Sequence, residues 1–204
     1  MKLFLFDFDG VIVDSLAVYE KTVKDNLQKI NQPIVKSREE FLELFEDNFY
    51  ESLKNRGIDL DVFMKAAEDI LAQVKIRDMQ PFPDIAQVIE ELHRKHCLVV
   101  ISSNDNASIK EALDFFNYDD YFKEILGSDF MFSKKEKILY AAKKYGVDPQ
   151  NIYYIGDTTG DIKEGKQAGV KTVGVTWGWH SKEKMAASEP DYLFDKPQEL
   201  LQLN

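Results

Sequence analysis

Five short apolar runs, the later ones separated by helical patterns, restrict the fold of this chain more than any other feature of its sequence. They cover residues 3–6, 97–101, 152–155, 172–175 and 192–194. Strands that alternate with helices form a parallel sheet, and strands covered by helices on both faces are apolar throughout rather than alternating. The sequence therefore predicts an α/β fold built on a parallel sheet.

Between the first two runs, no convincing strand pattern appears. Apolar residues recur there at helical spacing, as at Phe41, Leu44 and Phe45. Ser-Arg-Glu-Glu at 37–40 has the pattern of a capping box that opens a helix, and Asn-Arg-Gly at 55–57 is typical of a helix end. This interval is therefore expected to be helical.

At about 65 residues, the interval is far too long for a crossover loop between two strands. We expect an inserted all-helical domain at residues 15–81, with the two prolines of Pro81-Phe82-Pro83 marking the return hinge. Residues 1–14 and 82–204 are then the core domain.

Polar side chains follow three of the predicted strands at the points where they end. They are Asp7 with Asp9, Ser102 with Ser103, and Asp157 with Asp161. Because open α/β sheets bind ligands at the carboxyl ends of their strands, we expect these groups to converge at one sheet edge. Buried carboxylates need neutralising, and oxygen ligands in a small site favour Mg²⁺, which commonly works with phosphate. The pattern thus predicts a magnesium site.

Each of these residues also has a purely structural interpretation. Asp-x-Asp-Gly at 7–10 is ordinary turn chemistry, whereas Asp157, Asp161 and the two serines are typical of helix N-termini. The two interpretations are compatible, because a helix N-terminus is itself a binding site for anions.

Three lysines, Lys134, Lys135 and Lys137, lie in the first turn of a helix that Ser133 is expected to cap. Cations at that end oppose the helix dipole. Either one of them binds a phosphate and offsets the carboxylates, or all three are solvated surface residues.

Composition excludes several classes of function. The net charge of −10 and the lack of a basic patch argue against nucleic acid as a partner, so a phosphate site must be locally positive. The single cysteine, Cys97, lies in an apolar run and is expected in the core, which fits a reducing compartment. No signal-peptide pattern and no window of about 20 apolar residues appears, so no membrane role and a soluble, cytoplasmic protein are expected.

Two later features carry less weight. Trp177-Gly178-Trp179-His180, after the fourth predicted strand, is either an aromatic surface loop packed on the core, which we expect, or a segment near the cleft mouth. His93 and His96, at a helix end, are expected to be surface residues.

Together the motifs resemble those of the haloacid dehalogenase superfamily of phosphohydrolases, in the phosphoglycolate-phosphatase-like and β-phosphoglucomutase-like subgroup with a helical C1 cap. DFDGVIVDS at 7–15 is similar to the first motif, Ser102 to the second, a lysine near Lys134 to the third, and GDTTGD at 156–161 to the fourth. The resemblance spans nearly the whole chain. It implies a Rossmann-like, three-layer core with a parallel sheet, and an inserted helical cap.

The resemblance also implies a chemistry. Asp7 would be the nucleophile that forms an aspartyl-phosphate, and Asp9 would protonate the leaving oxygen and then activate water. Mg²⁺ would be held by Asp7, the backbone carbonyl of Asp9, and Asp157, with Asp161 supporting the metal's waters or the lysine. An aspartate at position 9 argues for phosphate esters and against the dehalogenase members.

Ser102, or Ser103 one residue later, would bind the phosphoryl oxygens together with Lys134. The chain lacks the usual Lys-Pro signature of the third motif, so either neighbouring lysine is an alternative to Lys134. Asp84 stands where similar proteins often carry glycine after the Pro-Phe-Pro return, which is expected to affect the hinge more than the chemistry.

The leading hypothesis is a Mg²⁺-dependent phosphatase that hydrolyses a small phosphorylated metabolite, as a monomer or homodimer. The alternatives are a sugar-phosphate mutase of the β-phosphoglucomutase type, which needs a seat for a second phosphate, and a non-catalytic phosphate-binding regulatory protein. Substrate choice is expected to lie in the cap, where Lys36, Arg38, Lys54 and Arg56 are placed to reach the site.

Overall fold

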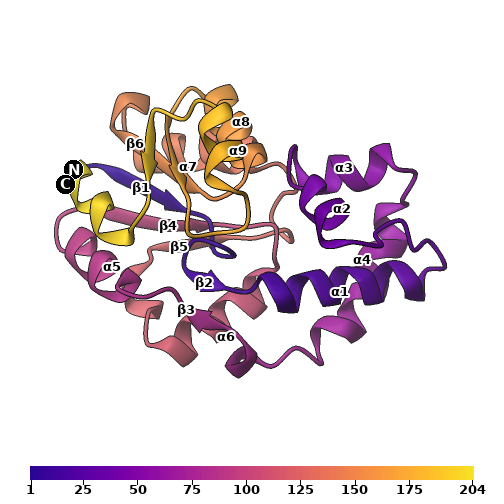
Figure 1. Cartoon of the computed structure of the whole chain (residues 1–204). Coiled ribbons are helices and arrows are strands. Elements are labelled where there is room, and N and C mark those ends of the chain that lie inside the picture. The colour runs from indigo at the N-terminus through magenta and orange to yellow at the C-terminus, as the bar shows by residue number, and fades with distance from the viewer.

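A six-stranded parallel sheet forms the centre of the computed structural model, which describes residues 1–204 (Figure 1). From edge to edge the strands run in the order β5, β4, β1, β6, β7 and β8, and every neighbouring pair is parallel. Their bounds are β1 Leu3–Phe6, β4 Cys97–Ile101, β5 Glu124–Leu126, β6 Ile152–Gly156, β7 Lys171–Val175 and β8 Tyr192–Phe194. With β1 between β4 and β6, the chain changes direction across the sheet at β1, where such folds bind ligands.

Helices cover both faces of this sheet, and the side chains of β1 show why its sequence is apolar throughout. Leu3 and Leu5 belong to a cluster with residues of α7, whereas Phe4 and Phe6 belong to one with residues of α5 and α6. The helices of this part are α5 Ile85–His93, α6 Asn106–Phe116, α7 Lys134–Tyr145, α8 Thr159–Ala168 and α9 Lys182–Ala187. The predicted three-layer α/β fold is confirmed, and Cys97 lies in its core.

Four helices lie between two very short strands and form the end of the molecule away from the sheet (Figure 1). They are α1 Leu16–Lys29, α2 Arg38–Glu43, α3 Phe49–Asn55 and α4 Leu60–Leu71. As predicted, Ser37 and Glu40 form the capping box of α2, and α3 ends at Asn55. Their apolar cluster contains one residue from outside the segment, Trp179.

The two connections to this helical segment run side by side. Strand β2 Val13–Asp14 pairs with β3 Gln80–Pro81 in antiparallel register. Shortly after β3, Asp84 adopts a left-handed backbone with φ of 65°, a conformation that glycine adopts without strain and aspartate tolerates. Its carboxylate accepts a hydrogen bond from the Gln198 side chain, which ties the connection to the C-terminal segment.

Short 3₁₀ helices complete the chain: η1 Ile76–Asp78, η2 Asp119–Tyr121, η3 Pro149–Asn151 and η4 Pro197–Leu203. None of the helices is at once long enough and apolar enough to span a lipid bilayer.

Candidate active site

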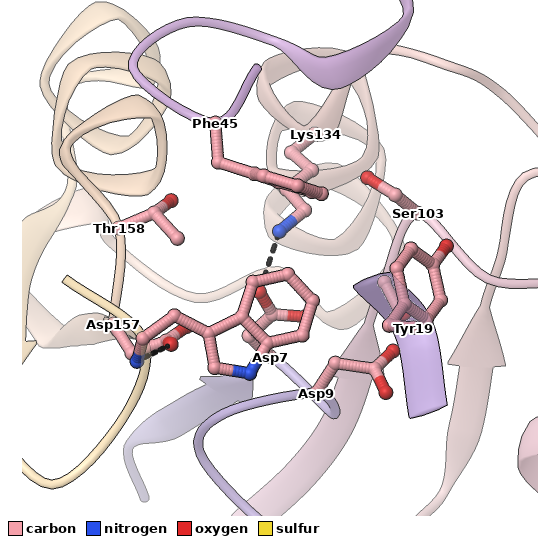
Figure 2. A pocket seen from close by; sticks show the side chains of 10 residues that line it. Asp7, Asp9, Tyr19, Phe45, Ser103, Lys134, Asp157 and Thr158 are labelled. Carbon is pink, nitrogen blue, oxygen red and sulfur yellow. Dashed lines mark hydrogen bonds and ion pairs between the residues drawn. The ribbon is translucent and has the colours of Figure 1, made fainter. Parts of the chain in front are cut away.

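The carboxyl ends of β1, β4 and β6 meet at a small pocket beneath the inserted helices (Figure 2). Ten residues line it: Asp7, Asp9, Tyr19, Phe45, Ser102, Ser103, Lys134, Asp157, Thr158 and Trp179. Every residue predicted to touch metal or phosphate is in this set. Asp161, predicted to act from behind, is not a lining residue.

The carboxylates of the pocket fit a divalent cation. One oxygen each of Asp7, Asp157 and Asp161, all buried, lie within 4.8 Å of one another. The Oδ1 atoms of Asp9 and Asp157 are buried and have no hydrogen-bond partner. Unpaired buried carboxylate oxygens are costly, and a hard cation that takes oxygen ligands would satisfy them.

Burial raises the pKa values of the three lining carboxyl groups. It raises the pKa of Asp7 to about 7, although Lys134 opposes the shift, and that of Asp9 to about 6. It raises the pKa of Asp157 well above the usual range, and repulsion from Asp161 and Asp7 adds to the effect. A protein that keeps such groups ionised at neutral pH needs positive charge beside them.

Lys134 supplies part of that charge from the first turn of α7. Its Nζ donates to Asp7 Oδ2 at 2.6 Å and to Asp161 Oδ1 at 2.7 Å (Figure 2). Burial lowers the pKa of Lys134, but Asp161 and Asp7 outweigh that effect and raise it. Of the three candidate lysines, therefore, the structure brings Lys134 to the carboxylates.

The other two lysines have different surroundings. Lys137 is fully buried and donates to the backbone carbonyl of Ser102 at 2.6 Å, so it supports the loop after β4. Burial, together with repulsion from Lys134, lowers the pKa of Lys137 to about 7. Lys135 is half-buried outside the pocket, and its backbone N–H donates to Glu164.

Asp161 is both a capping residue and a support for the lysine. Its Oδ2 accepts from the Thr158 N–H and hydroxyl within the capping box that opens α8. Its Oδ1 accepts from Lys134 and, at 2.7 Å, from the Tyr154 hydroxyl. Lys134 and these hydrogen bonds hold the pKa of Asp161 below its usual range, against the effect of burial. The sequence did not identify Tyr154, which reads only as an apolar strand residue.

The two serines after β4 both line the pocket, so both alternatives for the second motif remain. Ser102 is buried, and its Oγ accepts from the Asn104 N–H at 3.0 Å. The backbone carbonyl of Ser103 accepts from the Tyr50 hydroxyl of α3 at 2.6 Å.

The segment Trp177-Gly178-Trp179-His180 lies at the pocket, so the expectation of an aromatic surface loop is wrong. The Trp179 N–H donates to Asp157 Oδ2 at 2.7 Å, and its ring packs among aromatic residues of the inserted helices. His180 is buried, and its Nε2 bonds to the Leu42 carbonyl at 3.0 Å. The loop therefore connects a metal-ligand candidate to the helical segment.

Main-chain and side-chain contacts hold the helical segment over the pocket. The Phe45 carbonyl accepts from the Gly160 N–H of α8 at 3.0 Å, and Asn48 donates to Glu164 at 3.1 Å. Exposed ion pairs, Lys163–Asp47 and Lys184–Glu46, lie at the margin. The segment is in a closed arrangement in which Tyr19 and Phe45 cover the carboxylates (Figure 2).

Residues 4–175 match the family model for haloacid dehalogenase-like hydrolases. The chain is 25% identical to a phosphoglycolate phosphatase of Synechococcus elongatus, covering 99% of this chain and 96% of that protein. It is 27% identical to a phosphoglycolate phosphatase of Aquifex aeolicus, covering 100% of this chain and 96% of that protein.

Solved structures show the same fold. A predicted phosphatase from Clostridium acetobutylicum superposes with a TM-score of 0.84 at 23% identity, over 98% of this chain and 96% of that one. A haloacid dehalogenase-like family protein from Streptococcus pneumoniae does so with a TM-score of 0.79 at 22% identity, over 99% and 97%. The family match confirms the predicted resemblance, and this chain belongs to the haloacid dehalogenase-like hydrolase family.

Proposed function

We propose that this enzyme is a Mg²⁺-dependent phosphatase that transfers the phosphoryl group of a small phosphorylated metabolite to Asp7 and then to water. The family and its phosphatase relatives support phosphoric monoester hydrolysis. The observation that carries the proposal is the contact of Lys134 with Asp7 in one pocket with the unpaired oxygens of Asp9 and Asp157.

In the first half-reaction an Asp7 carboxylate oxygen attacks phosphorus, and the bond from phosphorus to the ester oxygen breaks. Asp9 gives its proton to that leaving oxygen. The raised pKa of Asp9, about 6, keeps a larger fraction of this group protonated near neutral pH than an ordinary aspartate would have. The products are an alcohol and a phosphorylated Asp7.

In the second half-reaction Asp9, now ionised, takes a proton from water as the water oxygen attacks phosphorus. The bond between phosphorus and Asp7 breaks, which releases inorganic phosphate and restores both carboxyl groups. Lys134 and a serine hydroxyl after β4 bind the phosphoryl oxygens as their charge shifts.

Asp7, Asp157 and the backbone carbonyl of Asp9 would hold Mg²⁺, which when bound neutralises the carboxylates and polarises the phosphoryl oxygens. Asp161 would keep Lys134 charged and oriented. Residues 15–81 would act as a cap that opens on the paired β2 and β3 connections and excludes water when closed.

The two alternative functions have less support. A mutase needs a seat for a second phosphate, and Lys134 is the one cation that lines the pocket. A non-catalytic role does not explain why a buried nucleophile candidate, its lysine and unpaired carboxylate oxygens are kept together at a cost in stability.

The test is hydrolysis of p-nitrophenyl phosphate with Mg²⁺ and with EDTA. We expect turnover that depends on Mg²⁺ and is lost in Asp7→Asn, because an amide cannot form the phosphoryl intermediate. Asp119→Asn, at an exposed site, is the matched control and should keep wild-type turnover.

Asp9→Asn separates the two proposed roles. Since p-nitrophenolate leaves without protonation, this variant should lose more activity on an alkyl phosphate than on p-nitrophenyl phosphate in the phosphoryl-transfer step, measured as the burst of phosphorylated enzyme. Wild-type-like turnover in Asp7→Asn would contradict the nucleophile assignment.

A further inference from the structure

Two further cavities adjoin the pocket between the sheet and the inserted helices, and each has a volume of about 50 Å³. Tyr19 lines the pocket and both cavities, so it stands where the three meet. Since a water molecule needs roughly 10–15 Å³ measured in this way, each cavity has room for a few heavy atoms. In the closed arrangement, the alcohol part of the substrate has these spaces available.

The cavity under α1 and α4 is mainly apolar. Its wall consists largely of aromatic and aliphatic side chains, among them Tyr19, Val23, Phe49, Tyr50, Phe63 and Met64. The second cavity, beside Asp9, is also mainly apolar, with Val18, Leu71 and Val74 in its wall. Such walls favour a compact organic group over a strongly hydrated one.

Neither cavity has a lysine or an arginine in its wall, and the charged residues there are the acids Asp9, Asp105 and Glu111. The cap cations expected to reach the site lie elsewhere, so that expectation is wrong. Arg38 pairs with Glu20 at 2.8 Å and Arg56 with Glu43 at 3.6 Å. Lys36 and Lys54 are exposed.

A substrate with a second anionic group would therefore bury that group without a partner. A carboxylate or second phosphate in these cavities would lose its hydration and face acidic neighbours, and both effects oppose binding. The wall thus selects against anionic alcohols.

One side chain in the larger cavity offers a specific contact. Asn26 of α1 is 1% exposed, and its Nδ2 donates to the Phe63 carbonyl at 3.0 Å. Because that carbonyl can only accept, the amide oxygen is the atom left over, and Oδ1 has no partner. An unpaired buried amide oxygen costs free energy that a donor on the ligand would recover.

On these grounds, and resting on the proposed function, we propose that the cavity between α1 and α4 binds an uncharged alcohol portion of the substrate. A hydroxyl or amide N–H of that portion donates to Asn26 Oδ1, while its carbon atoms pack on Tyr19 and Phe63. The preferred substrates are thus small monophosphate esters of neutral, hydroxylated alcohols, not esters of hydroxy acids.

The experiment compares two esters of equal length, 2-hydroxyethyl phosphate and 2-phosphoglycolate, on the wild-type enzyme with Mg²⁺. We expect kcat/KM to be at least 10-fold higher for 2-hydroxyethyl phosphate. Equal values, or a preference for 2-phosphoglycolate, would overturn the inference. Turnover of p-nitrophenyl phosphate is measured alongside, and its absence would show instead that the proposed function fails.

Asn26→Leu tests the specific contact, with propyl phosphate as the ester that lacks a terminal donor. The variant should lose most of the preference for 2-hydroxyethyl over propyl phosphate, through KM rather than kcat, and should keep p-nitrophenyl phosphate turnover. Asn26→Ser serves the same purpose if the leucine variant does not fold. An unchanged preference in the folded variant would overturn the role of Asn26.

Discussion

Asp157 shows at the scale of one residue how this site trades stability for chemistry. Its carboxyl group is 1% exposed, and one of its oxygens has no hydrogen-bond partner. Its pKa in the folded protein is raised well above 3.8, chiefly by burial. The folded state thus favours the protonated form, and the resulting stability is present below about pH 4 and lost as pH rises through the folded pKa.

We predict that metal-free Asp157→Asn is more stable than the metal-free wild type at pH 8, by ~2 kcal/mol, since the amide carries no charge to desolvate. At pH 5 the difference should be smaller. Urea unfolding in EDTA at the two pH values measures it.

Mg²⁺ should reverse the order at pH 8. Binding to the folded wild type stabilises it by about 2.7 kcal/mol at a concentration of 100 times Kd, whereas the variant should gain little. A variant that is less stable than the wild type without metal at pH 8 would contradict the account of Asp157, and exposed Asp119→Asn is the neutral control.

The charged residues of the site were predictable from sequence, whereas the aromatic ones were not. Asp7 and Asp157 were expected at strand ends because an acid directly after a buried apolar strand is costly unless the strand opens into a cleft there. Tyr19 and Trp179 carry no such local signal, since their place over the carboxylates depends on how the inserted helices pack on the core. Only the three-dimensional arrangement identifies them.

At the scale of elements, the loop after β7 acts as a wall behind Asp157. A Cβ at Gly178 would overlap the Asp157 side chain and the Gly10 carbonyl. We predict that Gly178→Ala displaces the carboxylate, costs about 1–3 kcal/mol of stability and lowers Mg²⁺-dependent turnover at least 10-fold.

Gly146→Asn is the matched control for a loop glycine. Gly146 ends α7 with φ of 61° and has open space around its Cβ position, and asparagine tolerates this conformation. Thermal unfolding and Mg²⁺ titration of the two variants check the prediction. If Gly178→Ala binds Mg²⁺ as the wild type does, the loop has no such role.

Element boundaries were predictable where the signal is local. Ser37 and Ser133 cap their helices as expected, because a cap needs only a side chain and the next few amides. Strand β5 was missed because Glu124-Ile125-Leu126 is too short to show a period, and its pairing with β4 depends on residues far away in the sequence.

At the scale of the whole molecule, closure of the helical segment depends on a close approach of two backbones. Gly160 lies in the first turn of α8, where a Cβ would come within 2.5 Å of the Asp47 carbonyl oxygen and 2.8 Å of that of Phe45. Both oxygens belong to the inserted segment and neither to the core. The glycine is therefore needed for closure but not for the fold of the core.

We predict that Gly160→Ala leaves the melting temperature equal to or above that of the wild type, since alanine favours a helix over glycine by up to about 1 kcal/mol. Turnover of small alkyl phosphates should nevertheless fall at least 10-fold, because the cap cannot close to exclude water. Gly165→Ala, in the same helix, is the matched control. Its Cβ would lie 2.7 Å from Thr172 Cγ2 inside the core, so this variant should instead lose about 1–3 kcal/mol of stability. Wild-type kinetics in Gly160→Ala would show that catalysis does not need the closed arrangement.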